Sequence, residues 1–464
     1  MVMESITIIT PTGCIGNRGI DREALAAAVA AEAPHAIAVD AGSIDCGPWY
    51  LGAGREHSPI AHIEWDIEVI LDCAIPNGIP VIIGSAGGSG ARAHVDRTVE
   101  IVRRIAAAKG HRFRLAVIYA DVDPDFLLER EQDGVIAGSA QITDQTPLSA
   151  DAVRASDVIV GMMGVGPIIE ALEAGADVIV AGRTVDAAVI AALPISKGFD
   201  KGLSYHMGDI MECAESCAIE IEPTLRALGR NRIPIIGRIV GNAFFLKPAV
   251  TTLACTPESC LMHSAYERTD MDTIKVPEGR VDRATALYEA EDRNTTRISG
   301  SRFIDEPHSI LFEGVRKVGY RSIFPFAVRT PQMISQLDEI LANVDEIERG
   351  LFSSAGNFHI HWHRYGQDAV LGAAEPETSP YEVGLLADVV ADSQELAHDV
   401  AYDLFTRIGF WRYPGRYTTA GNIAVTLSPA VFDGGPVYEF SIYHAVQIDE
   451  SEPLFKVEIM EVSE

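Results

Sequence analysis

The sequence predicts an α/β protein that begins with a parallel sheet covered by helices on both faces and continues into an α+β domain. Three observations lead to this prediction. Short, continuously apolar runs alternate with longer helical patterns in the first half, as expected for strands that are buried on both sides. Repeated strand–helix–strand units imply parallel strands with right-handed crossovers. The second half replaces this alternation with shorter strands and turns.

Six apolar runs in the first half are predicted strands, because each is short and rich in Ile, Val and Ala. They cover residues 5–10, 35–40, 80–84, 115–120, 157–161 and 177–181. Helices are predicted between them: Asp21 is a suitable N-cap, Pro59 a suitable first-turn residue, and Gly110 a suitable C-terminal stop. We expect a doubly wound sheet, and a β/α barrel is the alternative.

The C-terminal part predicts a ferredoxin-like unit, in which the elements follow as strand, helix, strand, strand, helix, strand from about residue 314. The predicted strands cover 319–329, 357–365, 383–391 and 437–446. The predicted helices cover 330–349 and 392–409. Between about 247 and 310 the pattern indicates short strands and turns. We therefore expect two domains, 1–245 and 246–464, with a boundary near residue 245.

Charge and composition narrow the functional classes. The chain has 464 residues and a formal net charge of -29, which argues against nucleic-acid binding and against anionic membranes. Seven Cys without a CxxC pair predict neither a disulfide framework nor a zinc ribbon. The first residues do not look like a signal peptide, and no apolar stretch reaches about 20 residues. We therefore expect a cytoplasmic protein.

Polar and small residues follow the carboxyl ends of the predicted strands, where ligands bind both in open parallel sheets and in β/α barrels. Residues 84–90 form a Gly-rich turn before a helix, so its backbone N–H groups are candidates to bind an anion, and a simple tight turn is the alternative. Its spacing matches neither GxGxxG nor the P-loop, so NAD or ATP binding is not supported. The candidate substrate-binding residues at this rim are Thr12, Gly13, Gly84, Ser85, Gly87, Gly88, Tyr119, Met162, Met163, Gly164 and Arg183.

Carboxylates at the same rim are the candidate catalytic groups. Two carboxylates that flank a hydroxyl, as in residues 40–45, can divide into an acid and a base. They can instead hold a divalent metal such as Mg²⁺ or Mn²⁺, or only satisfy local turns. Arg183 is suited to grip a carboxylate or phosphate, although a structural ion pair is an equal alternative. The candidate catalytic residues are Asp40, Ser43, Asp45, Asp121, Asp186 and Glu212.

Two further patterns favour structural roles. His359, His361 and His363 alternate with bulky residues and therefore share one face of a strand. Neighbouring side chains on one strand face do not close a tetrahedral zinc site by themselves. Cys46 follows Asp45, whose negative charge disfavours a thiolate, so we expect an unreactive cysteine.

Several motifs, each weak alone, occur together along nearly the whole chain. They lie at residues 39–48, 83–88, 160–164, 181–186, 212–213, 300–303, 319–322 and 419–422. On these motifs the chain resembles the acyclic terpene utilisation AtuA-like family. The last motif adds Asn422 to the candidate substrate-binding residues.

The resemblance implies an enzyme of carboxylate or acyl-CoA catabolism. A small carboxylate or acyl-CoA substrate would undergo lyase, hydratase or isomerase chemistry at a carbon next to a carbonyl. In that hypothesis the Gly84–Gly88 turn and Arg183 bind the anionic group, and Asp40, Asp45 or Asp121 moves a proton. The alternative is a non-catalytic binding or scaffolding subunit of a multi-protein complex. We expect a homo-oligomer, and a second small subunit is a further candidate partner.

Overall fold

The computed structural model describes residues 3–463 except 18, 134–135, 139–146, 223–231, 267, 269, 377–378, 418, 420 and 450–451, and gives the backbone alone for 131–133 and 136–138. The chain forms two compact units, one made of Met1–Arg316 with Phe440–Glu464 and the other of Lys317–Glu439. The predicted α/β class is confirmed. The predicted boundary near residue 245 falls inside strand β10 (Ala243–Pro248), within the first unit.

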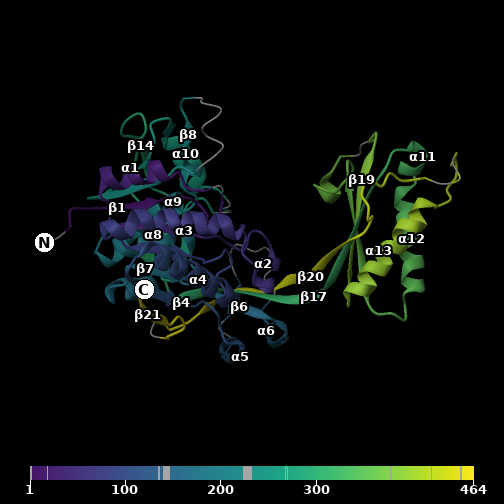
Figure 1. The fold of residues 1–464 in the computed structure, drawn as a ribbon, viewed down its shortest axis with the longest axis horizontal. Helices are drawn as coiled ribbons and strands as arrows, with labels where there is room; N and C mark the ends of the chain where they lie inside the picture. Colours follow the sequence, from purple (N-terminus) through teal and green to yellow (C-terminus); the bar gives the residue numbers. More distant parts are fainter. Residues whose placement is uncertain are drawn as a thin grey trace. The chain divides into compact units, whose positions relative to one another are not determined.

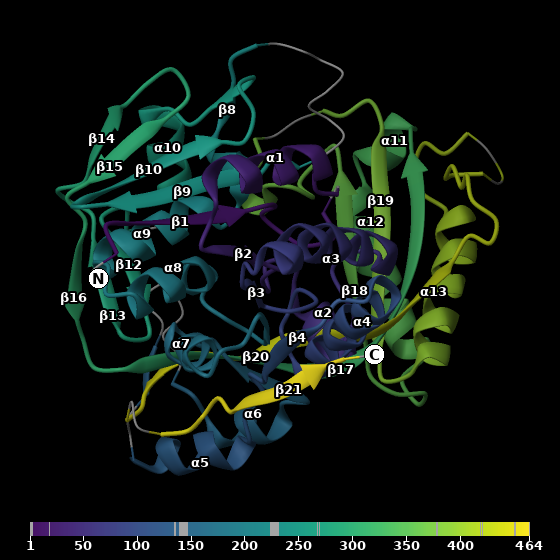
Figure 2. The same ribbon diagram turned by 60° about the vertical axis from the view of Figure 1, so that its left-hand side comes forward.

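A mixed sheet is the framework of the first unit. Its strands run, from edge to edge, in the order β14 (Leu287–Ala290), β15 (Thr296–Ser299), β10, β9 (Ile235–Val240), β1 (Ser5–Thr10), β2 (Ala36–Asp40), β3 (Val81–Gly84), β7 (Val178–Ala181), β4 (Phe113–Ile118) and β21 (Val457–Val462). The neighbours from β1 to β4 pair in parallel, as predicted. The strands on either side are antiparallel, so the sheet is mixed rather than wholly parallel. Figure 2 shows the succession from β14 to β1.

Helices pack on both faces of this sheet. One face carries α1 (Arg22–Glu32), α3 (Ile60–Ala74) and α4 (Arg92–Lys109). The other carries α7 (Gly166–Glu173), α8 (Asp186–Ser196) and α9 (Lys201–Met211). Successive residues of a strand point to opposite faces, so Ile83 packs in the first layer and Ile82 in the second. Both faces are therefore apolar, which explains the continuous apolar runs of the sequence.

One predicted strand lies outside this sheet. Strand β6 (Val158–Gly161) was expected to join the parallel strands, but it pairs antiparallel with residues Phe312–Val315 of β17 (Ser309–Val328). A short strand has the same continuous apolar pattern in any sheet that is covered on both faces, so the sequence did not distinguish pairing with the parallel strands from pairing with β17. Nearby lie α5 (Pro124–Asp133), α6 (Ala150–Ala155) and β5 (Ile136–Gly138), which pairs with β20 (Phe432–Gln447).

The segment from 247 to 310 forms short strands and turns, as predicted, together with helix α10 (Pro257–Ser264). Strands β12 (Thr273–Val276), β13 (Gly279–Asp282) and β16 (Arg302–Asp305) make a three-stranded antiparallel sheet. It packs closely on α9, because a Cβ on Gly202 would lie 2.8 Å from the backbone of Arg302. The remaining short elements of this unit are α2 (Pro48–Ala53), η1 (Ile75–Asn77), η2 (Ala214–Cys217), β8 (Ile219–Glu220) and β11 (Leu253–Ala254).

The second unit has its own core. Its elements are the later part of β17, α12 (Leu337–Leu351), β18 (Phe358–Tyr365), β19 (Val383–Ala391), α13 (Gln394–Gly409) and the first part of β20, with the short α11 (Pro331–Ile334) and η3 (Gly372–Ala374) between them. The first five follow the predicted order, whereas the predicted last strand, 437–446, lies mostly in the part of β20 that belongs to the first unit. Strand β19 pairs antiparallel with both β17 and β18, and α12 and α13 pack on one side, as Figure 1 shows. The ferredoxin-like and doubly wound assignments stay predictions. In the described parts of the chain, helices that combine the length and hydrophobicity for a membrane crossing are absent.

Candidate functional site

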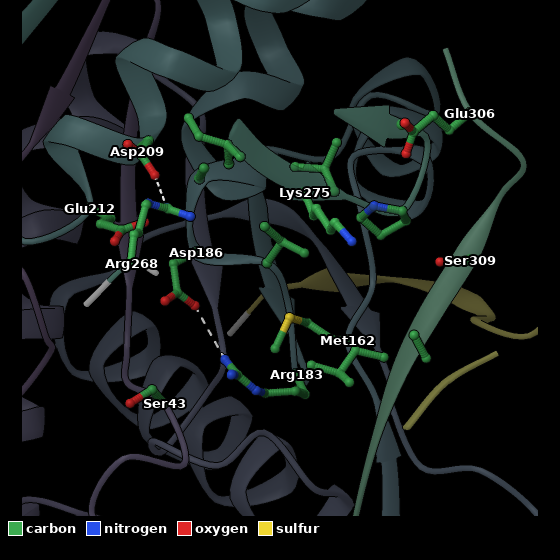
Figure 3. Close-up of a pocket in the computed structure, with 18 of the residues that line it drawn as sticks. Ser43, Met162, Arg183, Asp186, Asp209, Glu212, Arg268, Lys275, Glu306 and Ser309 are labelled. Carbon is green, nitrogen blue, oxygen red and sulfur yellow. Dashed lines mark hydrogen bonds and ion pairs between the residues drawn. The ribbon is translucent and has the colours of Figure 1, made fainter. Parts of the chain in front are cut away.

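A cavity of about 380 Å³ lies in the first unit, where segments after β2, β6 and β7 meet segments of the region from 247 to 310. Its volume is in the range of small-molecule sites. Six residues predicted from sequence line it: Ser43, Asp45, Met162, Arg183, Asp186 and Glu212. Figure 3 shows most of them around one space. Asp40, Ser85 and Met163, which follow or end strands at the same predicted rim, are outside the set that lines the cavity.

A pair of packed helices brings two of the acids together. Asp186 is the first residue of α8, and Glu212 follows the last residue of α9. The helices approach closely at Gly208, where a Cβ would lie only 2.4 Å from the carbonyl oxygen of Ala187. The start of α8 and the end of α9 therefore face the cavity side by side. A side chain at position 208 would push the two carboxylates apart.

Arg183 is the buried centre of a polar network. Its guanidinium binds Glu313 through two nitrogens, with Nε 2.9 Å from Oε2 and Nη2 3.2 Å from Oε1. Its Nη1 donates to Ser85 Oγ and to Asp186 Oδ1, each at 3.2 Å. Arg183 is only 4% exposed, and the side chain of Glu313 is fully buried. A buried charge is tolerated only when paired and hydrogen-bonded, so this arginine positions Asp186 and is itself fully engaged by acids.

The two cavity acids hold their protons unusually tightly. Burial raises the pKa of Asp186 to about 6, the charge of Arg183 opposes this rise, and Asp45 adds to it. Burial also raises the pKa of Glu212 well above its usual value, and the negative charges of Asp186 and Asp209 raise it further. Neighbouring acids in a poorly solvated site cannot all ionise near neutral pH. The pair is therefore suited to both accept and donate a proton.

Asp40, the last residue of β2, is 4% exposed and interacts electrostatically with Asp186. Its Oδ2 accepts the N–H of Gly42 at 2.8 Å, and its Oδ1 has no hydrogen-bond partner in the described part of the chain. Burial and the charge of Asp186 raise the pKa of Asp40 well above its usual value. Asp40 is thus electrostatically linked to the cavity, although it does not line it.

The Gly-rich turn at 84–90 is built into the protein. The N–H groups of Ser85 and Ala86 donate to the carbonyls of Gly182 and Ala181, and those of Gly88 and Gly90 donate to carbonyls within the turn. Glycine is required for space as well as for φ, since a Cβ on Gly88 would lie 2.5 Å from the His57 ring. Among the described residues that line the cavity, none comes from this turn. These four N–H groups are therefore not free to bind an anion.

Other predicted residues have local structural contacts. Thr12 Oγ1 donates to Cys14 O, Tyr119 OH donates to Asp96, and burial raises the pKa of Asp121 against the charge of Arg92. Gly13 packs against the backbone of Cys213, and Gly164 packs against the side chain of Glu278. Met163 forms a β-bridge with Thr184. Asn422, in the second unit, donates to the carbonyls of Ile408 and Trp411 at the end of α13. These residues are outside the set that lines the cavity.

Asp209 lies in the same helical stretch as the candidate Glu212, and sequence reasoning missed the other charged residues of the cavity, Arg268, Lys275 and Glu306. Asp209, on α9, forms ion pairs with Arg268 and with Arg283, the latter at 3.2 Å. Lys275, on β12, and Glu306, after β16, lie elsewhere on the cavity wall. All except Asp209 come from the segment of short strands, which carries no parallel-strand signature that would have pointed to a ligand site.

Groups of three or more His, Cys, Asp or Glu side chains arranged to hold a metal ion are absent from the residues that the structure describes, His359, His361 and His363 included. None of the seven cysteines, all of which the structure describes, forms a disulfide bond, and Cys46 is exposed.

The fold and the cavity together define an α/β protein with a cavity that several carboxylates line. A family model described as acyclic terpene utilisation family protein AtuA matches residues 59–429 of the chain. The chain belongs to this family, which confirms the resemblance seen in the sequence. No curated protein and no solved structure gives a match.

Proposed function

We propose that the protein is an enzyme that moves a proton at a carbon next to a carbonyl group, in a small carboxylate or in the acyl part of a CoA thioester. The reaction class is lyase, hydro-lyase or isomerase. The observation that carries the proposal is that Asp186 and Glu212 line one cavity and both have raised pKa values. Such perturbed acids concentrate at catalytic sites because proton transfer needs groups that titrate near the working pH.

The two acids divide the work by their affinities for a proton. In its charged form, Asp186, with a pKa of about 6, accepts the proton from the α-carbon. Glu212, whose pKa is raised well above its usual value, donates a proton either to a leaving hydroxyl or to another carbon. In the first case a C=C bond forms and water leaves, and in the second the double bond moves. Arg183 holds the Asp186 carboxylate through Nη1 at 3.2 Å.

Hydrogen exchange with solvent tests this proposal without knowledge of the full reaction. The purified chain is incubated in D₂O with a panel of short carboxylates and their CoA esters, and deuterium at the α-carbon is measured by mass spectrometry. We expect incorporation by the wild type and at least a hundredfold slower incorporation by Asp186→Asn and Glu212→Gln. Asp151→Asn is the control, since its side chain is 98% exposed on α6.

The same assay separates the proposal from its alternative. Incorporation by the isolated chain contradicts a purely non-catalytic subunit. Incorporation that appears only when a second, copurifying chain is added favours a multi-subunit enzyme. Equal incorporation by wild type and both acid variants contradicts the roles of Asp186 and Glu212.

A further inference from the structure

The cations at the Asp186 end of the cavity are already neutralised. Arg183 is held by Glu313 and Asp186, and Arg268 by Asp209. Arg283, just behind, is also bound to Asp209. A substrate carboxylate at this end would face acidic side chains, and the arginines there would not attract it because they are already paired with those acids. Such an anion would be repelled, whereas a neutral carbonyl or hydroxyl could accept a hydrogen bond from a protonated carboxyl group.

Lys275 differs from these arginines because its ammonium group is not paired with an acid of the described residues. It is exposed on β12, lines the cavity, and has neither an ion pair nor a hydrogen bond to any other residue that the structure describes. Glu306, another acid that lines the cavity, is engaged by Arg280, with Nε 3.2 Å from Oε1. Figure 3 shows Lys275 between Glu306 on one side of the view and Asp209 and Glu212 on the other. The ammonium group of Lys275 is therefore available to a ligand.

Apolar residues also line the cavity. Met162 follows β6 and Leu311 lies near the start of β17. Ile274 and Val276, the neighbours of Lys275 on β12, are buried, because successive residues of a strand point to opposite faces. An ammonium group beside an apolar wall favours a ligand with an anionic end and a short hydrocarbon segment. The cavity thus has one anion-binding position, at Lys275, and one proton-transfer position, at Asp186 and Glu212.

From this arrangement we infer the substrate class: a short-chain acid with a single anionic group, bound by Lys275, and a neutral carbonyl or hydroxyl group, bound at Asp186 and Glu212, with a few carbon atoms between them. The inference rests on the proposed function for the role of the two acids. It makes Lys275 the residue that selects substrates by charge. A second anionic group at the far end is disfavoured, because no unpaired cation lies there among the described cavity residues.

Three five-carbon probes test this charge pattern. They are 4-oxopentanoate, with one carboxylate and one carbonyl, pentanoate, with the carboxylate alone, and pentanedioate, with two carboxylates. Binding is followed by the rise in melting temperature and by calorimetric titration at pH 7.5, since a ligand that binds only the folded state stabilises it. The variants are Lys275→Met, Lys275→Arg and, as a control, Lys197→Met, which changes an exposed lysine outside the cavity.

We expect 4-oxopentanoate to bind more tightly than either other probe. Lys275→Met should weaken its binding by about tenfold or more, and Lys275→Arg and Lys197→Met should retain it. Retention of binding in Lys275→Met, tighter binding of pentanedioate, or the absence of binding by all three probes overturns the inference.

The outcomes also separate this inference from the proposed function. Deuterium incorporation that requires Asp186 and Glu212 but does not respond to Lys275→Met leaves the function standing and removes the charge-selection role. Binding of 4-oxopentanoate that depends on Lys275, without incorporation into any compound of the panel, leaves the binding pattern standing and removes the proton-transfer function.

Discussion

Replacement of Asp186 by Asn is expected to stabilise the folded protein at neutral pH, although it removes an ion pair with Arg183. Burial raises the pKa of Asp186 from 3.8 to about 6, and the attraction of Arg183 offsets this only in part. The folded protein therefore holds the proton more tightly than the unfolded chain does. At neutral pH the ionised carboxylate of Asp186 is a net cost to the folded state, and Asn removes this cost.

The magnitude and the sign follow from proton linkage. Between pH 3.8 and about 6 the folded state keeps a proton that the unfolded chain has lost, so the free energy of unfolding falls as pH rises through this window. At about 1.4 kcal/mol per pH unit, the full interval corresponds to about 3 kcal/mol. The advantage of Asp186→Asn should therefore be near zero below pH 4 and grow between pH 4 and 6. It should grow further as Glu212 titrates, because the charge of Asp186 also raises the pKa of Glu212.

Urea unfolding of the wild type and the variant at pH 4, 5, 6 and 7.5 measures this advantage. Fluorescence of Trp49 and Trp65 reports on the first unit, provided that the Trp362 and Trp411 signals are separated by substitution. Asp151→Asn serves as the control for loss of an exposed carboxylate. A variant that is less stable than wild type at pH 7.5, or a difference that does not change with pH, would refute the reasoning.

Three further predictions concern the framework of the site. Gly90→Ala should destabilise the fold far more than Gly110→Ala. Both glycines have φ +69°, so the backbone strain is the same. A Cβ at position 90 would lie 2.3 Å from the backbone nitrogen of Arg183, whereas a Cβ at position 110 meets nothing within 4 Å. Gly110→Ala should cost about 1 kcal/mol, and equal melting temperatures for the two variants would contradict this account. Glu313→Gln should cost about 3–5 kcal/mol in urea unfolding, because it leaves the buried Arg183 without its main countercharge; a loss below about 1 kcal/mol would argue against that pairing. Asp40→Asn should slow deuterium incorporation and keep the circular dichroism spectrum of wild type, because Asp40 is electrostatically linked to Asp186 without lining the cavity; unchanged incorporation would exclude this influence of Asp40 on the proton transfer.

Much of the framework could be predicted from the sequence because the parallel strands carry a strong local signal. A strand buried on both faces is continuously apolar, so β1, β2, β3, β4 and β7 were each located within about two residues. The carboxyl ends of parallel strands lie at one edge of a sheet, so the sequence alone places Asp45 and Asp186 at a common site, and both line the cavity.

The remainder of the site depends on contacts between segments that share no local pattern. Glu313 is 130 residues from Arg183, and their pairing follows only from the position of β17 beside β6. Lys275 and Arg268 come from short antiparallel strands and turns whose location relative to the parallel sheet has no sequence signature. The Gly-rich turn was predicted to bind an anion for a related reason. Close packing against His57 and Arg183 requires glycine, and anion binding by backbone N–H groups favours glycine too, so the sequence does not separate the two roles.

The central claim is that Asp186 and Glu212 hold a proton between them near neutral pH, and carboxyl ¹³C NMR titration tests it most directly. Resonances of Asp- and Glu-labelled protein are assigned by their loss in Asp186→Asn and Glu212→Gln. The account predicts a midpoint near pH 6 for Asp186, a midpoint well above the ordinary glutamate value for Glu212, and a fall in the Glu212 midpoint when Asp186 becomes Asn. Ordinary midpoints near pH 4 for both groups, or a Glu212 midpoint that does not respond to the loss of Asp186, would contradict it.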